Sequence, residues 1–413
     1  MSLSRRGLLA GAGGAAALTA LAALPATLRA APPPLGSMIE TPAAITRAER
    51  LARIAKVQGL MQAQGLAALL VESGSSLTYF TGIRWSRSER ITAAVIPASG
   101  QSIVVTPFFE APSVKETLAV PADVRAWHED ASPFALIADA LQGLTGAVAV
   151  EQTTRAFITE GLKREGRFEV VSGAALVDAC RQIKSPAEQA LMRQANAITL
   201  AAMREARGMV RPGMTASDIG ALIEKATVRM GAEHDFALVL LNEASAYPHG
   251  SHQPQTVHEG SVVLMDCGCV LEGYQSDISR TFVFGEPTPR QRKVWETIRR
   301  GQDMVFGAAK VGVPVSKLDA AVRRFYEREG WGPGFTLPGL PHRVGHGIGM
   351  DGHESPYLVG SDQTPLAPGM CFSNEPGLYI PGEFGMRLED CWVMTEAGPQ
   401  SFTPLARSLD DPI

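Results

Sequence analysis

The strongest constraint on this chain is an apolar stretch, residues 261–284, that carries two aspartates and is predicted to fold back on itself. Strand alternation places Asp266 on the same face as apolar neighbours. A turn predicted at Leu271–Gly273 contains the midpoint between Asp266 and Asp277, so the two carboxylates should lie nearly opposite each other. Facing side chains in such a ladder lie about 4.5–5.5 Å apart, and like charges there repel. The hairpin therefore needs something that compensates two negative charges.

A second pair of carboxylates shows the same arrangement nearer the C-terminus. Glu375 and Glu389 lie in apolar strands predicted at residues 370–375 and 386–395. The midpoint between the two glutamates is Gly382, in a Pro-Gly-Glu sequence that strongly favours a tight turn. The chain thus predicts two hairpins, each with two acids that face one another.

Three kinds of compensation are open for four acids on apolar strands. Two crowded carboxyl groups can share a proton, since the pKa of one of them is then strongly raised. The acids can instead bind the nearby Arg280 and Arg387, or face water. We favour bound divalent metal, because four carboxylates can neutralise two divalent cations.

Histidines strengthen the metal interpretation. Six of the eight fall in two glycine-containing segments, residues 247–258 and 342–353. Glycine there permits close approach of the backbone to a ligand. His346 would complete an oxygen-rich ligand set with a single imidazole. Because that set contains no thiolate, manganese, cobalt, iron and zinc are all compatible with it.

The five cysteines are interpreted as small buried apolar residues. They are too few and too scattered for a disulfide framework, although one bridge that the spacing does not locate is open. Cys267 and Cys269 alternate with Asp266 along the predicted strand, so they should point away from the carboxylates.

Alternating helices and strands from about residue 40 predict an α/β N-terminal domain over residues 40–178. Its expected strands are Ala67–Val71, Ile91–Ile96, Ser102–Thr106 and Ala147–Glu151. Its expected helices are Thr46–Gln64, Phe134–Leu144 and Thr154–Arg164, and Tyr79, Arg84 and Trp85 are interpreted as packing residues of a loop.

A second domain is predicted over residues 179–413. Ser185 is typical of a helix N-cap, with Pro186 at the first helical position and Glu188 at the third. Three similar helix starts follow, at Thr215, Thr288 and Ser316. The expected strands are Phe236–Leu241, Ser261–Val270, Tyr274–Phe284, Met370–Glu375 and Met386–Thr395.

The N-terminus resembles an export signal. Arg5 and Arg6 precede a weakly apolar run from residue 8 to residue 24, and small residues follow near Ala30. The run is short for a membrane span, which needs about 20 residues. We interpret residues 1–30 as a twin-arginine signal peptide of a bacterial protein and residues 31–39 as a linker. The alternative is an uncleaved N-terminal anchor. Periplasmic or exported localisation is therefore expected, with no stable membrane association after cleavage.

The net charge argues against anionic partners. The net charge is −4, and removal of the three arginines in residues 1–30 makes it −7. A mildly acidic chain without a run of basic residues has no electrostatic reason to bind nucleic acid or anionic lipid.

Local motifs resemble the pita-bread metallopeptidases, which include methionine aminopeptidase, aminopeptidase P and prolidase. Their ligand order is Asp, Asp, His, Glu, Glu, and the matching motifs here are MDCGCVLEGYQSDISRTF, HRVGHGIGMDGHE, FSNEPGLYIPG and GMRLED. The stretch GLAALLVESGSSLTYFTGI resembles the creatinase/prolidase N-terminal domain, which methionine aminopeptidase lacks. The resemblance covers about residues 40–405. It implies an α/β N-terminal domain followed by an α+β pita-bread catalytic domain.

The resemblance also implies residue roles. Asp266 would chelate one metal ion, Asp277 and Glu389 would bridge two ions, and His346 and Glu375 would bind the other. A metal-bridging water or hydroxide would be the nucleophile, with Glu375 as its proton acceptor. His353 would polarise the scissile carbonyl, and His249 would lie near the leaving nitrogen. His342 would line the pocket for the residue after the cut, and Arg387 would contact the carboxylates. These roles imply a metallopeptidase with two divalent ions, manganese preferred and cobalt, zinc or iron compatible.

Xaa–Pro bonds in small peptides are the expected substrate, and a homodimer is expected from the relatives. Two alternatives stay open. The same scaffold supports hydrolases and a lyase that act on other small, non-peptide substrates, and some relatives are non-catalytic binding proteins. The metal-free creatinase reaction is disfavoured, because all five ligands are present.

Overall fold

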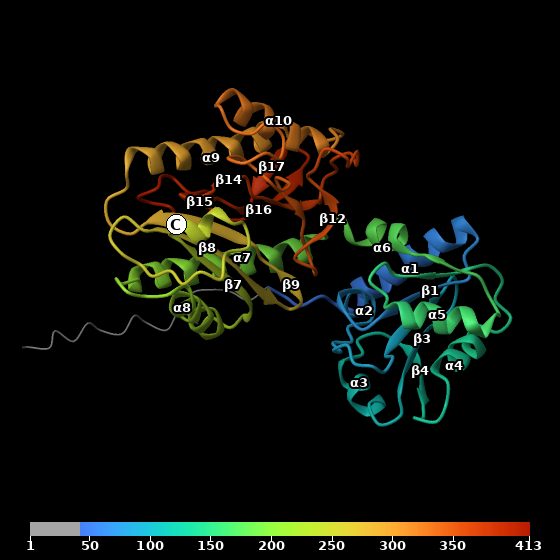
Figure 1. Ribbon diagram of the computed structural model, residues 1–413. Coiled ribbons are helices and arrows are strands. Elements are labelled where there is room, and N and C mark those ends of the chain that lie inside the picture. Colours follow the sequence, from blue (N-terminus) through green and yellow to red (C-terminus); the bar gives the residue numbers. More distant parts are fainter. Residues whose placement is uncertain (1–41) are drawn as a thin grey trace, which may run out of the picture. The chain divides into compact units, whose positions relative to one another are not determined.

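The computed structural model describes residues 42–413, and its N-terminal part is an α/β unit (Figure 1). A mixed sheet has the strand order β4-β3-β2-β1-β5-β6, in which only β2 runs against its neighbours. The strands are β1 (Ala68–Glu72), β2 (Ala93–Pro97), β3 (Ser102–Pro107), β4 (Ala122–Trp127), β5 (Val148–Val150) and β6 (Val170–Ser172). The α/β class predicted for this part is confirmed.

Helices pack beside this sheet. They are α1 (Arg47–Gln64), α2 (Ser75–Thr81), α3 (Ala111–Thr117), α4 (Pro133–Ala140), α5 (Ala156–Glu165) and α6 (Ala174–Arg181). Helix α1 begins after Thr46, whose hydroxyl accepts from the Glu49 amide, and ends at Gly65 with φ 66°. The loop expected around Tyr79 is wrong, because that residue lies in α2 and is buried.

The C-terminal part places sheets between two helix pairs (Figure 1). One pair is α7 (Pro186–Met209) and α8 (Ala216–Arg229), and the other is α9 (Pro289–Ala308) and α10 (Ser316–Arg328). The capping boxes expected at Ser185, Thr215 and Thr288 are present. The start predicted at Ser316 is wrong in detail, since the N-cap is Val315 and no side chain caps that helix.

Two sheets and one hairpin make up the β structure of this part. The first sheet contains β7 (Glu233–Leu241), β8 (Val262–Leu271), β9 (Tyr274–Gln275) and β10 (Ile278–Val283). The second contains β11 (His346–Gly347), β12 (Glu354–Tyr357), β13 (Cys371–Asn374), β16 (Asp390–Thr395) and β17 (Gly398–Ser401). The strands β14 (Gly377–Ile380) and β15 (Phe384–Arg387) form a separate two-stranded hairpin, and β14 also makes a single bridge to Gly339.

The second predicted hairpin is confirmed in register. Gly377 pairs with Arg387, and Asn374 pairs with Asp390. Glu375 and Glu389 therefore lie between two paired segments, at matching places where the ribbon passes from one sheet to the hairpin. Gly382 lies in the turn with φ 78°, a conformation that favours glycine.

The first predicted hairpin is correct in its turn but wrong in its register. The turn residues are Glu272 and Gly273, both with positive φ, so Asp266 pairs with Ser279 and not with Asp277. Asp277 lies in the irregular step between β9 and β10. Because Asp277 and Ser279 are two residues apart, Asp277 still shares the face of Asp266, now on the diagonal.

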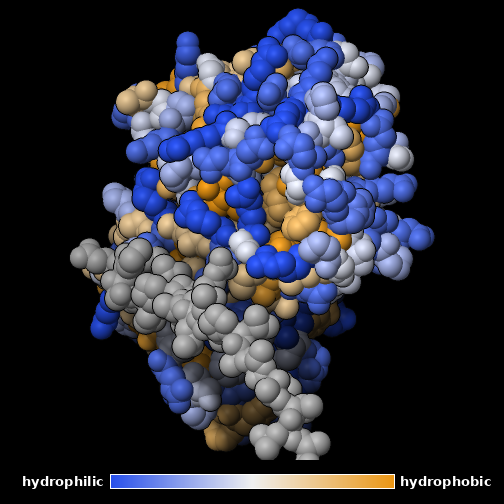
Figure 2. Space-filling view, turned by 90° about the vertical axis from the view of Figure 1, so that its left-hand side faces the viewer, coloured by the Kyte–Doolittle hydropathy of each residue, from blue (hydrophilic) through white to orange (hydrophobic). Residues whose placement is uncertain are grey.

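The face of the molecule in Figure 2 is mostly hydrophilic, with a hydrophobic patch near its centre. Among residues 42–413, no helix is long and apolar enough to cross a membrane. All five cysteines are buried and free, which confirms their interpretation as core residues. The predicted signal peptide (residues 1–30) and linker (residues 31–39) lie outside the described residues, and the boundary at residues 178 and 179 stays a prediction.

Candidate metal centre

All nine residues singled out in the sequence line one pocket of about 550 Å³. They come from strands far apart in the chain and from the loops beside them. The residues are Asp266, Asp277, His346, Glu375, Glu389, His249, His342, His353 and Arg387.

The five predicted ligands form two overlapping clusters. In one, oxygens of Asp266, Asp277 and Glu389 lie within 4.8 Å of one another. In the other, the same limit holds for ligand atoms of His346, Glu375 and Glu389. Glu389 belongs to both clusters, which is the arrangement expected of a side chain that bridges two ions.

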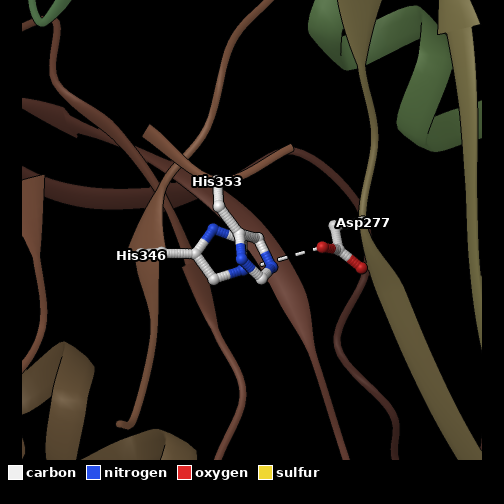
Figure 3. Close-up of side chains that lie close together, drawn as sticks. All are labelled: Asp277, His346 and His353. Carbon is white, nitrogen blue, oxygen red and sulfur yellow. Dashed lines mark ion pairs between the residues drawn. The ribbon is translucent and has the colours of Figure 1, made fainter. Parts of the chain in front are cut away.

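The orientation of His346 suits a metal ligand (Figure 3). Its Nδ1 lies 3.1 Å from the Gly347 carbonyl oxygen, which can only accept, so Nδ1 carries the proton. The free lone pair of Nε2 then points at carboxylates, with Asp277 and Glu375 oxygens both at 3.6 Å. Burial lowers the pKa of His346 well below its usual value, which keeps the ring neutral. A second interaction that fixes the tautomer is typical of metal-binding histidines.

The acids of this pocket repel one another. Burial raises the pKa of Asp277 well above its usual value, and the nearby Asp266 and Glu375 raise it further. Burial and the same crowding raise the pKa of Glu389 in the same direction. The pKa of Glu375 rises to about 7, mainly through burial. Without a cation, the cluster would have to hold protons that a carboxylate normally releases.

Arginine compensates only one side of the cluster. The Arg387 guanidinium donates to Asp266, and its Nε donates to Ser279 Oγ at 2.9 Å. Arg280, the other candidate, forms its ion pair with Asp390 instead. The alternative in which both arginines neutralise the ligands is therefore wrong for Arg280.

The donor set fits two divalent ions. Glu389 Oε1 is buried and has no hydrogen-bond partner in the described part of the chain, although it faces His346 Nε2 at 3.9 Å. A buried, unpartnered carboxylate oxygen is costly, and a metal ion would satisfy it. Four carboxylates and one neutral imidazole match ions that prefer oxygen and nitrogen ligands.

His342 lies beside the ligand cluster, with its Nδ1 3.8 Å from Glu375 Oε2, and is held by two hydrogen-bond partners. Its Nδ1 donates to the Arg343 carbonyl oxygen at 2.7 Å, and its Nε2 accepts from the Tyr379 hydroxyl at 3.0 Å. That hydroxyl accepts in turn from Arg387 at 2.7 Å. Burial lowers the pKa of His342 to about 3, so the ring is neutral.

His353 presents an N–H to the pocket. The Arg343 guanidinium, which can only donate, lies 2.9 Å from His353 Nδ1. Nδ1 therefore accepts, and the proton is on Nε2. The ring lies 4.0 Å from that of His346, centroid to centroid, and the two rings point toward Asp277 (Figure 3). His249 is exposed at the same pocket.

Sequence reasoning missed three polar residues of this site, Ser279, Tyr379 and Arg343. Ser279 Oγ lies 2.9 Å from both Asp266 Oδ1 and Glu389 Oε2. None of the three is an acid on an apolar strand or a clustered histidine, so the patterns used to find the ligands give no signal for them. The "HR" of HRVGHGIG was the only visible cue for Arg343.

A second buried polar cluster lies behind the ligands. Arg280 donates to the Glu389 carbonyl oxygen at 2.7 Å and to Asp390 Oδ1 at 2.6 Å. Gln302, from α9, donates to Asp390 Oδ2 at 3.0 Å and to the Asn374 carbonyl oxygen at 3.2 Å. Asn374 and Asp390 directly adjoin the two metal-site glutamates, so this cluster ties together the strands that carry them.

Comparison with known proteins identifies both parts of the chain. The family model of "Metallopeptidase family M24" matches residues 190–396, and that of "Creatinase/Prolidase N-terminal domain" matches residues 53–183. The "Probable dipeptidase PepE" of Mycobacterium tuberculosis is 33% identical over 82% of this chain and 90% of its own length. The "Xaa-Pro dipeptidase" of Lactobacillus helveticus is 30% identical over 86% of this chain and 97% of its own.

Solved structures give the same answer for the fold. The crystal structure of dipeptidase PepE from Mycobacterium ulcerans superposes with a TM-score of 0.81 at 32% identity. It covers 88% of this chain and 97% of the other. The predicted combination of a creatinase-type N-terminal domain and a pita-bread catalytic domain is therefore confirmed.

Proposed function

This chain belongs to metallopeptidase family M24 and is a peptidase, and from that premise we propose that it hydrolyses Xaa–Pro bonds in small peptides with two divalent metal ions. The observation that carries the proposal is the pair of ligand clusters that meet at Glu389, whose Oε1 is buried without a partner. The crowding of acids supports metal binding, and the relatives named dipeptidase support catalysis over a non-catalytic binding role.

The assignment of ligands follows from the two clusters. Asp266, Asp277 and Glu389 would hold one ion, and His346, Glu375 and Glu389 would hold the other. Asp277 also lies near His346 Nε2, which supports the role of a second bridging ligand. When bound, a pair of such ions activates water and stabilises the negative charge that develops on the scissile carbonyl.

The protein's own groups would then move the proton and orient the substrate. Glu375, beside the imidazole of His346, would accept the proton of the attacking water and pass it to the departing amine. His353 would donate its Nε2–H to the scissile carbonyl oxygen. His249, exposed at the same pocket, would contact the nitrogen that leaves.

Small peptides suit the pocket. Its volume of about 550 Å³ lies in the ordinary range for small-molecule sites. Phe236 and Leu238 supply apolar surface for a side chain, and Arg343 supplies positive charge for a carboxylate. The preference for proline rests on the relatives named Xaa-Pro dipeptidase, and other relatives are named dipeptidase only.

A substrate panel tests the proposal. Purified protein, stripped of metal and reloaded with manganese, cobalt or zinc, is assayed on Xaa–Pro dipeptides, Xaa–Pro–Yaa tripeptides and dipeptides without proline. We expect turnover on Xaa–Pro peptides that is highest with manganese. Equal rates on peptides without proline would contradict the proline preference, and no turnover of any peptide by the metal-loaded protein would favour the alternative function.

Export and assembly complete the proposal. The paired arginines Arg5 and Arg6 support export by the twin-arginine route to the periplasm. We also propose a homodimer in solution, which light scattering of the mature protein measures. The double variant Arg5→Lys, Arg6→Lys should stay in the cytoplasm, which cell fractionation measures.

A further inference from the structure

Arg181, the last residue of α6, connects the N-terminal α/β unit to the loop that carries His353. One terminal nitrogen of its guanidinium donates to Ser75 Oγ at 2.9 Å and Ser76 Oγ at 3.0 Å, both in α2. The other donates to Asp351 Oδ2 at 2.9 Å and Glu354 Oε2 at 2.6 Å. The two acids lie on either side of His353 in the sequence, so one side chain holds the chain both before and after His353.

The first half of this loop is held by the catalytic part, where Gln275 donates from its backbone N–H to the Gly349 carbonyl oxygen at 2.8 Å and from its side chain to the Met350 carbonyl oxygen at 3.3 Å. Residues 348–353 form no helix or strand, and His353 itself is exposed. Gly349 makes room for the charged groups, since a Cβ there would lie 2.7 Å from Glu354 Oε1. Asp351 is 42% exposed and is bound by Arg181 and by Ser75 Oγ at 2.8 Å. Closer to His353, the N-terminal unit adds side-chain anchors at Asp351 and Glu354, through Ser75 and Arg181.

The side chain of Arg181 is only 8% exposed, so its charge is almost fully removed from water. A buried guanidinium is tolerated only where its donors are well paired. A planar fork that reaches two carboxylates and two hydroxyls at once is a geometry that arginine provides and lysine does not. Simple attachment of the two parts would not require such a fork next to a pocket residue.

We infer that Arg181 is a positioning residue that fixes the place of His353 and thereby makes the N-terminal unit a working part of the peptidase pocket. The inference rests on the proposed function, in which His353 donates to the scissile carbonyl. Arg343 orients the imidazole ring, and Arg181 fixes the backbone that bears it. Neither arginine takes part in the two ligand clusters.

Substitution of Arg181 with a matched control tests this role in the full-length, metal-loaded protein. In Arg181→Met, Glu354 keeps its ion pair with Lys184. In the control, Arg155→Met, the buried Glu72 likewise keeps a second arginine, Arg87, at 3.5 Å. The contacts of Arg155 lie within the N-terminal unit. In each variant, a buried glutamate thus loses one arginine partner and retains a second cationic partner.

We expect kcat on a Xaa–Pro dipeptide to fall about tenfold to a hundredfold in Arg181→Met, because a displacement of about 1 Å at a reacting group has an effect of that size. KM should change less than threefold, and the affinity of the apoprotein for manganese by calorimetry should be unchanged. Hydrogen exchange of residues 351–354 should become faster. The control should match the wild type in all four measurements.

Two gentler variants keep the test decisive if Arg181→Met folds poorly. Arg181→Lys retains the charge, so it should fold stably yet recover little of the lost kcat. Ser75→Ala removes one hydroxyl and no charge, and should lower kcat by a few-fold. Full kcat in Arg181→Lys, a loss in Arg155→Met equal to that in Arg181→Met, or weaker manganese binding would overturn the inference.

The exchange measurement separates this inference from the proposed function. If the wild type cleaves no Xaa–Pro peptide, the proposed function fails, whereas faster exchange at residues 351–354 in Arg181→Met would still support the anchoring of the loop. If the wild type is active and exchange in that loop is unchanged, only the role of Arg181 fails.

Discussion

Two adjacent residues, Glu389 and Asp390, end up in opposite electrostatic situations. Both are buried acids, and strand alternation turns one toward the pocket and the other to the back of the same ribbon. Asp390 accepts hydrogen bonds at both oxygens, from Arg280 and Thr403 at one and from Gln302 at the other. Glu389 faces other acids, and its Oε1 has no partner in residues 42–413.

The difference shows which cluster needs cations from the solution to balance its charge. The cluster behind the ligands contains its own countercharge, Arg280, so its charges are balanced as folded, although Arg280 Nε, Gln302 Oε1 and Asn374 Oδ1 have no hydrogen-bond partner among the residues that the structure describes. The pocket cluster brings four acids together with one arginine and one neutral imidazole. Its negative charge is therefore not balanced by the protein alone, and the cluster behind it ties together the strands that carry the acids.

The largest expected effect is that of Glu389→Gln. The amide keeps the shape of the side chain but removes the charge that both ligand clusters share, so turnover should fall by about three orders of magnitude or more. Metal content, measured by mass spectrometry of the purified protein, should drop below two ions per chain. Asp390→Asn makes the same chemical change one residue further on, and should keep both ions.

If Glu389→Gln still bound two ions and Asp390→Asn did not, the contrast between the two sides of the ribbon would be wrong. Loss of both ions in each variant would instead mean that the clusters act as one unit. A difference between the variants in metal content therefore tests the comparison directly, whatever the substrate.

The next effect is on stability and concerns Arg280→Met. Arg280 and Asp390 are both fully buried, so removal of the cation leaves an unpaired charge in the core. Such losses cost about 3–5 kcal/mol of unfolding free energy. Chemical denaturation of the metal-free protein measures it. The double variant with Asp390→Leu should recover most of the loss, because an apolar pair of similar volume replaces a buried ion pair well. A cost below about 1 kcal/mol for the single variant would contradict the pairing.

Removal of metal should make stability depend on pH in a specific direction. The folded pKa of Glu375 is raised from 4.5 to about 7, and those of Asp277 and Glu389 are raised as well. Above pH 4.5 the folded chain then binds more protons than the unfolded chain, so the unfolding free energy of the metal-free protein falls as pH rises. Glu375 alone contributes a loss on the order of 3 kcal/mol by the time pH exceeds 7.

Thermal melts of chelated and metal-loaded protein between pH 4.5 and 8 check this. The loaded protein should lack the decline, because bound cations stabilise the charged carboxylates. Parallel pH profiles for the two forms would show that the acids do not crowd in the free protein. Glu389→Gln, which removes one of the crowded acids, should flatten the decline of the chelated form.

The sequence predicts one hairpin better than the other for a physical reason. The turn at Gly382 has a positive φ, which glycine in the sequence indicates. Because Gly382 is the midpoint between Glu375 and Glu389, the pairing of these two residues follows from the sequence. In the first hairpin the turn includes Glu272 with φ 53°, a conformation that glutamate rarely adopts. That residue gives no signal, so the predicted partner of Asp266 is two residues away from the real one, Ser279.

Contacts between distant segments explain the rest of what the sequence missed. Tyr379 matters because Arg387 and His342 meet at its hydroxyl. Arg181 matters because α2 and the His353 loop meet at its guanidinium. A single sequence shows acids on apolar strands as an anomaly, but a tyrosine or an arginine in such places looks ordinary. Helix α2 was also missed, since Gly74 gives it no side-chain cap.

The smallest expected effect is at the tip of the second hairpin. Arg290, in the first turn of α9, donates two hydrogen bonds to the Glu383 carboxylate, at 2.6 and 2.8 Å. The two side chains are 53% and 42% exposed, so water competes for both charges. Arg290→Ala should therefore change the unfolding free energy by less than about 1 kcal/mol and leave metal content at two ions. A larger loss, or a missing ion, would mean that this surface pair helps to set the register that brings Glu375 and Glu389 together, a task we assign to Gly382 and the buried cluster behind the strands.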